Sequence, residues 1–257
     1  MSGKSETYHF ERALVGESLA ENVLVEIDGE GVISAVRADA PATGAGRIEG
    51  IALPGMANLH SHAFQRAMAG LSERASEGGN NFWTWRQTLY RMLAELSAGD
   101  IEAIATLLYM EMLKAGYTSV GEFHYLHHRP DGKPYSNVAV TSEAIFKAAN
   151  AAGLALTHLP ALYMTSGFGD DHLSAEQRRF YNDYGRFSGL LKEIVLLAEG
   201  YSNISVGLAL HSLRAVPQAV IGPAIQLIEG VAPGAPIHIH IAEQDQEVVD
   251  CLNFYDA

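Results

Sequence analysis

Residues 51–62, IALPGMANLHSH, and residues 236–243, PIHIHIAE, decide the fold of this chain. Each is a short apolar run that ends with histidines two positions apart, which is typical of a buried strand. Between the two runs, short apolar strands alternate with helical stretches, and glycines mark the joints. This alternation predicts a parallel sheet with crossover helices, as in a β/α barrel.

Five βα units fit the sequence, with strands expected near residues 51–59, 117–123, 154–162, 204–211 and 236–242. Two helices are clearest, because their apolar residues recur at helical spacing and each ends at a glycine. These are GDIEAIATLLYMEMLKAG at 99–116 and SEAIFKAANAAG at 142–153. The Gly-, Ser- and Asp-rich stretch 163–179 predicts a loop over the face where barrel enzymes hold their catalytic residues.

The first fifty residues follow a different pattern, in which short β-like runs alternate with turn signals. The runs are YHFERALV, NVLVEIDGEG and VISAVRAD, followed by APATGAG. We therefore expect an α/β protein with a small N-terminal β-sandwich-like unit at 1–50 and an incomplete TIM-type barrel at 51–257. A complete barrel has eight strands, so we expect about three strands to be missing and the chain to stop within the fifth helix.

Composition limits the classes of partner. The 257 residues are 48% hydrophobic, enough for a sizeable core, and carry a formal charge of −13. This charge repels phosphate backbones and anionic lipids, so nucleic acid and membrane partners are not expected, and an anionic substrate needs locally placed arginines. The single cysteine, Cys251, the polar N-terminus and the lack of a long apolar run favour a cytoplasmic protein.

Histidines at two strand ends predict a metal site. His60 and His62 lie two positions apart, so both rings project from one face of the strand towards the barrel axis. His238 and His240 share a face in the same way, and Glu243 follows at the mouth of that strand. We prefer His240 as the third ligand, because Glu243 could then take a proton from metal-bound water and pass it to a leaving amine.

Plainer interpretations exist for each motif. An isolated pair of alternating histidines can be structural, and Glu243 could be a solvated residue that stabilises a helix N-terminus. Two histidine-bearing strand ends in one predicted barrel favour the metal site. The sequence contains no glycine motif of the kind that binds an organic cofactor, so none is expected.

Four blocks together resemble the amidohydrolase superfamily: ALPGMANLHSHAFQRAMAGL, GYTSVGEFHYLHH, LALHSLRAV and PIHIHIAEQ. Within it they are most similar to the formimidoylglutamate deiminases of histidine degradation. The resemblance implies hydrolysis of N-formimino-L-glutamate to N-formyl-L-glutamate and ammonia with one Zn²⁺, although another divalent transition metal could serve. It also implies a cytoplasmic homodimer for the full-length enzyme.

Carried over by motif, the metal ligands are His60, His62 and His240, and the proton shuttle is Glu243. The resemblance implies substrate-binding roles for Gln65, Arg86, Tyr125, His211 and Arg214. The two arginines suit a small-molecule dicarboxylate substrate, because guanidinium groups bind carboxylates in a bidentate manner. Arg86 could instead stack on aromatic neighbours, and Tyr125, His127 and His128 could be ordinary loop residues; of these three, only Tyr125 is predicted to have a function.

The sequence also departs from the family pattern. The superfamily completes its metal site with an aspartate after the eighth strand and uses a histidine after the sixth, and both are expected to be missing. We therefore expect this chain alone to bind metal weakly and to be weakly active or inactive, with open sheet edges. Two alternatives stay open: an amidohydrolase that deaminates a cyclic amidine or nucleobase-like substrate, and a non-catalytic metal-binding fragment.

Overall fold

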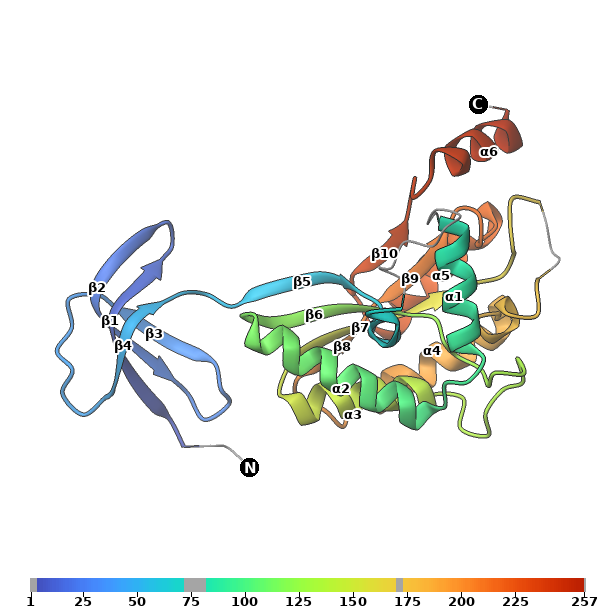
Figure 1. Ribbon diagram of the computed structural model, residues 1–257. Helices are drawn as coiled ribbons and strands as arrows, with labels where there is room; N and C mark the ends of the chain where they lie inside the picture. The colour runs from blue at the N-terminus through green and yellow to red at the C-terminus, as the bar shows by residue number, and fades with distance from the viewer. Residues whose placement is uncertain (1–3, 72–81, 170–172, 257) are drawn as a thin grey trace. The chain divides into compact units, whose positions relative to one another are not determined.

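The β-like runs at the start of the chain form a sheet of their own. A computed structural model of the protein describes residues 4–71, 82–169 and 173–256. These residues belong to two compact units, Met1–Gly55 and Met56–Ala257. The first unit has a four-stranded sheet in the order β3-β2-β1-β4, shown in Figure 1. Its strands are β1 (Glu6–Val15), β2 (Ser18–Ile27), β3 (Ile33–Arg37) and β4 (Gly46–Ala52).

The first three strands of this sheet are antiparallel, whereas β4 runs parallel to β1. Ile51 and Ala52 belong to β4, where they pair with Arg12 and Ala13. The predicted barrel strand at 51–59 therefore began too early, because its first two residues belong to the N-terminal sheet. The barrel strand begins at Met56, because Pro54 has no N–H to donate to a sheet.

The second unit is a curved parallel sheet with helices outside it. Its strand order is β10-β9-β7-β6-β5, with β8 paired to β7, and every pairing is parallel. The strands are β5 (Met56–Ser61), β6 (Tyr117–His124), β7 (Ala155–Leu162), β8 (Ile204–Val206), β9 (Leu208–Ser212) and β10 (Ile237–His240). Five βα units are present, so the incomplete TIM-type barrel is confirmed.

The predicted strand at 204–211 is divided at Gly207 into β8 and β9. A Cβ atom at this position would lie 2.5 Å from the carbonyl oxygen of Pro236 and 2.6 Å from Leu159 Cδ2. Only glycine allows this close approach between neighbouring strands.

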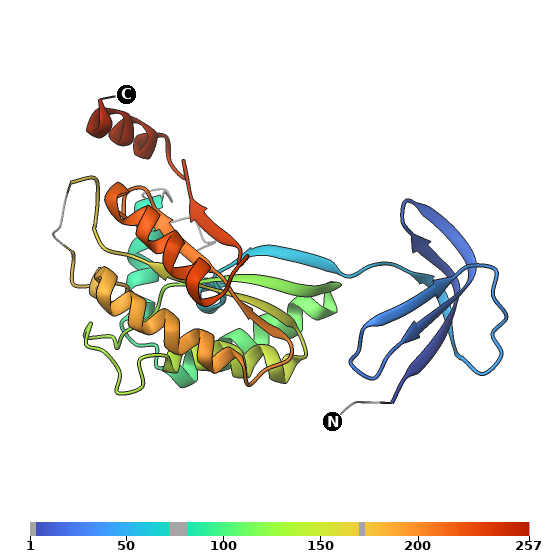
Figure 2. The same ribbon diagram turned by 180° about the vertical axis from the view of Figure 1, so that it is seen from behind.

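Four helices cover the outer face of the sheet, as Figures 1 and 2 show: α2 (Ala98–Lys114), α3 (Val140–Ala152), α4 (Tyr184–Ala198) and α5 (Gln218–Val231). The predicted helices at 99–116 and 142–153 correspond to α2 and α3. A capping box between Ser97 and Asp100 starts α2. Gly153 ends α3 in a left-handed conformation, with φ of 79°. The apolar core lies between these helices and the strands.

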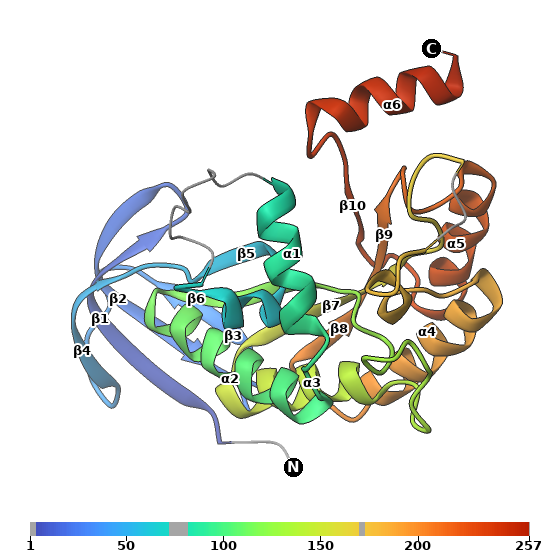
Figure 3. The same cartoon turned by 45° about the vertical axis from the view of Figure 1, so that its right-hand side comes forward.

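Shorter elements gather at the carboxyl ends of the strands, as seen in Figure 3. They are the 3₁₀ turns η1 (Ala63–Met68) and η2 (Gln177–Arg179) and the helices α1 (Phe82–Leu93) and α6 (Asp245–Tyr255). In the predicted loop at 163–179, η2 is the only helical element among the described residues; residues 170–172 lie outside them. No helix in the described ranges is both long enough and apolar enough to cross a membrane.

Candidate metal centre and substrate cavity

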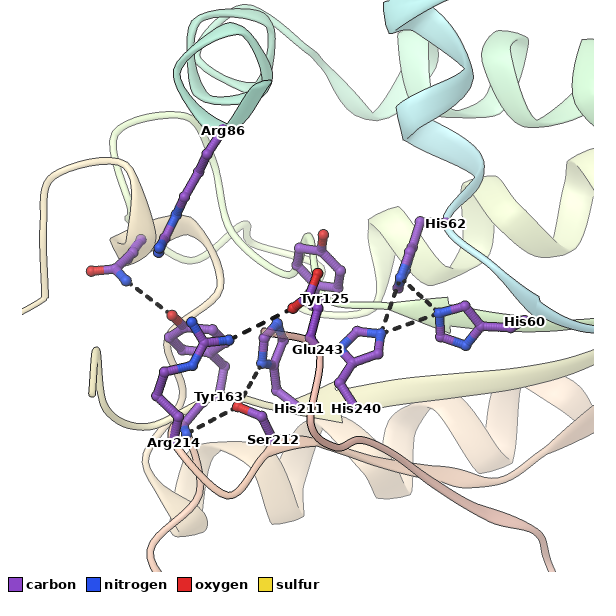
Figure 4. A network of polar contacts seen from close by, with 12 residues as sticks. His60, His62, Arg86, Tyr125, Tyr163, His211, Ser212, Arg214, His240 and Glu243 are labelled. Carbon is purple, nitrogen blue, oxygen red and sulfur yellow. Dashed lines mark hydrogen bonds and ion pairs between the residues drawn. The ribbon is translucent and has the colours of Figure 1, made fainter. Parts of the chain in front are cut away.

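The rings of His60, His62 and His240 meet at one point, although they come from two strands at opposite edges of the sheet. The Nε2 atoms of His60 and His62 are 3.1 Å apart, and that of His240 is 3.2 Å from each. Figure 4 shows the three nitrogens converging. The described part of the chain holds no second cluster of three ligand-type side chains, and His238 does not join this one.

These distances fit a bound ion better than hydrogen bonds among the rings. Each N···N hydrogen bond needs one protonated and one unprotonated nitrogen, so three nitrogens in mutual contact cannot all be paired. A tetrahedral ion about 2.0–2.1 Å from each nitrogen would hold neighbouring ligands about 3.3 Å apart. The observed triangle is close to this size, and its donor set suits zinc. Within the described residues, no carboxylate belongs to the cluster.

The electrostatics keep these imidazoles unprotonated. Burial lowers the pKa of His62 to about 3 and that of His240 to about 4, with the neighbouring histidines adding to both effects. Burial also lowers the pKa of His60. The His62 Nδ1 lies 2.8 Å from the carbonyl oxygen of Phe123, so Nδ1 carries the hydrogen and Nε2 offers its lone pair. The cluster is therefore ready to bind a cation near neutral pH.

Glu243 stands between the metal cluster and the arginine side of the cavity, as Figure 4 shows. It lies three residues after the end of β10 and just before α6, and its carboxylate is 4.0 Å from the guanidinium of Arg214. The residue before it, Ala242, has a φ of 56°. This left-handed conformation is rare for a residue with a side chain, and strain of this kind clusters at functional sites.

All nine residues singled out from the sequence line one cavity of about 390 Å³. Besides the three histidines and Glu243, these are Gln65, Arg86, Tyr125, His211 and Arg214. Gln65 donates from Nε2 to the Tyr125 hydroxyl over 3.3 Å. Burial, followed by the charges of His240 and Arg214, lowers the pKa of His211 well below its usual value. His211 is therefore neutral within the cavity.

Arg86 enters the cavity from α1 and also contacts an aromatic ring. Its Nε donates to the Tyr90 hydroxyl over 2.6 Å, and its guanidinium carbon lies 5.2 Å from the centre of the Tyr90 ring. Arg86 therefore both contacts an aromatic ring and lines the cavity. Two guanidinium groups at one cavity provide local positive charge in an acidic protein.

The sequence did not single out the cavity's remaining wall residues, which are Trp85, Leu89, Tyr90, Tyr163 and Phe180. Helical spacing from Arg86 could have indicated Leu89 and Tyr90, and Tyr163 directly follows β7. By contrast, His127 and His128 are buried and contact backbone carbonyls, of Ala161 and Tyr181 respectively. This arrangement agrees with a structural role for both histidines.

A buried carboxyl group supports the loop that carries the first two histidines. Glu122 on β6 is fully buried and accepts a 2.6 Å hydrogen bond from the backbone N–H of Ala63, the residue after His62. Burial raises the pKa of Glu122 from 4.5 to about 7, against the opposing effect of hydrogen bonds from Ala63, Ser61 and Tyr109. Glu122 thus fixes the chain from behind the cavity.

The chain belongs to the amidohydrolase family, whose pattern matches residues 51–257. It is 52% identical over 242 residues to a formimidoylglutamate deiminase from Pseudomonas aeruginosa. That alignment covers 94% of this chain and 52% of the relative, so the chain spans about half the length of this curated relative.

Solved structures agree on the fold. An amidohydrolase from Brucella melitensis superposes with a TM-score of 0.89 at 41% identity, over 98% of this chain and 55% of that protein. An adenosine deaminase from Xanthomonas campestris, solved with bound zinc, superposes with a TM-score of 0.72 at 18% identity, over 97% of this chain and 52% of that one. At 18% identity, the similarity to the adenosine deaminase shows a shared fold only.

Proposed function

We propose that this chain carries the metal and substrate site of a zinc-dependent deiminase, which converts N-formimino-L-glutamate and water to N-formyl-L-glutamate and ammonia. The observation that carries the proposal is one cavity containing three converging imidazoles, Glu243 and two guanidinium groups. The similarity to a formimidoylglutamate deiminase supports the choice of substrate.

The proposed ligands are His60, His62 and His240, which offer three unprotonated nitrogens at the distances given above. A zinc ion held by these ligands would supply a nucleophilic water at neutral pH, because zinc lowers the pKa of water from about 15.7 to about 7. Glu243 accepts the two protons of water one after the other at a carboxylate oxygen and delivers both to the imino nitrogen, whose bond to carbon then breaks to release ammonia. The oxygen of water remains in the formyl group, which balances the reaction.

The substrate has two carboxylates, and the cavity offers Arg86 and Arg214 to bind them. A neutral cyclic amidine offers no carboxylate to either guanidinium group, so the two arginines favour a dicarboxylate substrate. Gln65, Tyr125 and His211 complete the proposed binding surface. Together these groups hold the formimino carbon near the histidine cluster and Glu243.

The proposal is tested by adding N-formimino-L-glutamate to the zinc-loaded chain and measuring binding by calorimetry and ammonia release by a coupled assay. We expect binding and slow, zinc-dependent release. Glu243→Gln should abolish release and preserve binding. Arg86→Met should weaken binding of the dicarboxylate about 10-fold or more, whereas Arg186→Met, which alters an exposed arginine on α4, should not. Equal binding of the dicarboxylate and its neutral diamide would contradict the proposal.

A further inference from the structure

Tyr163 forms part of the cavity wall directly after β7 and is 3% exposed. Its ring is held edge-on against His211, with centroids 4.6 Å apart, and against Phe180, with centroids 5.6 Å apart. The ring therefore has little freedom to turn, and its hydroxyl occupies a fixed place at the cavity.

The direction of the Tyr163 hydroxyl hydrogen follows from two hydrogen bonds. The backbone N–H of Ser174 donates to Oε1 of Gln177 over 2.8 Å, which fixes the orientation of this buried amide because a backbone N–H requires an oxygen acceptor. The other end, Nε2, then donates to the Tyr163 hydroxyl over 3.0 Å. The hydroxyl oxygen thus acts as an acceptor towards Gln177, and its own hydrogen points elsewhere.

Among the residues that the structure describes, no acceptor receives this hydrogen. Burial raises the pKa of the Tyr163 hydroxyl, so the group stays protonated near neutral pH. The charges of Arg86 and Arg214 both act on the same hydroxyl, and both arginines line the same cavity as Tyr163. An O–H donor accompanied by two cations provides a binding place for a negatively charged acceptor.

We propose that Tyr163 is a further substrate-binding residue, whose hydroxyl donates a hydrogen bond to a carboxylate of the substrate. Gln177 is its positioning residue, because the amide holds the hydroxyl in the donating orientation. This inference rests on the proposed function, since it assigns a partner to an anionic group of that substrate. It adds an uncharged donor to the two arginines.

The test is calorimetric titration of the zinc-loaded chain with N-formyl-L-glutamate, the proposed product, and with its neutral diamide. Tyr163→Phe should weaken binding of the dicarboxylate by roughly 10- to 100-fold, as expected for losing a hydrogen bond to a charged group. The loss for the diamide should be smaller. Gln177→Met should weaken binding less than Tyr163→Phe and should add little to it in the double variant.

Tyr184→Phe is the matched control, because it removes a tyrosine hydroxyl that bonds to the carbonyl of Pro223 outside the cavity. Its binding should equal that of the unaltered chain. If Tyr163→Phe also binds like the unaltered chain, the role of Tyr163 is refuted and the proposed function stands. If the unaltered chain does not prefer the dicarboxylate, both the inference and the proposed function are refuted.

Discussion

The ring of Phe123 stacks on the ring of His240, with centroids 4.1 Å apart and planes inclined by 18°. The same residue accepts the hydrogen bond from His62 Nδ1 through its carbonyl oxygen. Phe123 is fully buried and lies on β6, whereas the two histidines follow β5 and end β10. One residue of an interior strand therefore contacts ligand histidines from both edges of the sheet.

Phe123→Leu is expected to weaken zinc binding by about 10-fold, because groups that orient metal ligands typically contribute this much. The leucine keeps the backbone carbonyl and most of the buried volume, so the loss reports on the stacked ring. Competition with a chromophoric chelator measures the effect. Phe146→Leu is the control, since Phe146 is equally buried but packs against His158 and Tyr201. Equal zinc affinity in the two variants would refute the role of stacking.

Zinc affinity should depend little on pH between 7.5 and 5.5. Three imidazoles with the usual pKa of about 6.5 would lose roughly a thousandfold in zinc affinity over this interval, because protons compete for each nitrogen. Here the pKa values of His62 and His240 are about 3 and 4, and that of His60 is lowered. We expect a loss below about 10-fold, measured by chelator competition at each pH. A thousandfold loss would show that the ligands titrate normally.

The ionisation of Glu122 should make the protein less stable as pH rises, which is opposite to the effect of an acidic residue with a lowered pKa. Its pKa is raised from 4.5 in the unfolded chain to about 7 in the folded one, chiefly by burial. Between pH 4.5 and 7 the folded protein keeps the proton on Glu122, whereas the unfolded chain loses it. The free energy of unfolding therefore decreases as pH rises through this interval. The loss amounts to roughly 2–4 kcal/mol.

Glu122→Gln isolates this effect, because glutamine still accepts from the Ala63 N–H but cannot ionise. The measurement is urea denaturation of the zinc-free chain at pH 5 and pH 8. The unfolding free energy of Glu122→Gln should increase relative to that of the unaltered chain as pH rises. The buried histidines contribute equally to both proteins and cancel in the difference. A difference that does not change with pH would show that Glu122 is ionised throughout.

The metal cluster could be predicted from the sequence because it depends on local patterns. Alternation along a strand places His60 and His62 on one face, and parallel strands bring their carboxyl ends to one edge of the sheet. The start of β5 was placed too early, because the apolar residues before Pro54 belong to a different sheet. Apolar character alone does not identify which sheet a strand joins.

The support around the site could not be predicted in the same way. Glu122 reaches the Ala63 N–H because β5 and β6 pair with Ser61 opposite Glu122, and this register follows from the whole sheet. Gln177 reaches Tyr163 through the path of a loop with no periodic pattern. Such contacts join residues far apart in the chain, and only tertiary packing determines them.

Arg179 should prove essential for the cavity although it does not line it. It is 2% exposed and donates to the backbone carbonyls of His128, Leu93 and Leu96, which ties the end of α1 to the neighbouring loop. Arg179→Met leaves three buried carbonyls unpaired, so we expect a loss of roughly 3 kcal/mol or more in unfolding free energy. Arg179→Lys should lose less, and dicarboxylate binding should weaken in both, because α1 carries Arg86. Thermal denaturation measures the stability and calorimetry measures the binding. Arg178→Met, at the exposed neighbouring residue, is the control. Unchanged dicarboxylate binding in a folded Arg179→Lys variant would limit Arg179 to a stabilising role.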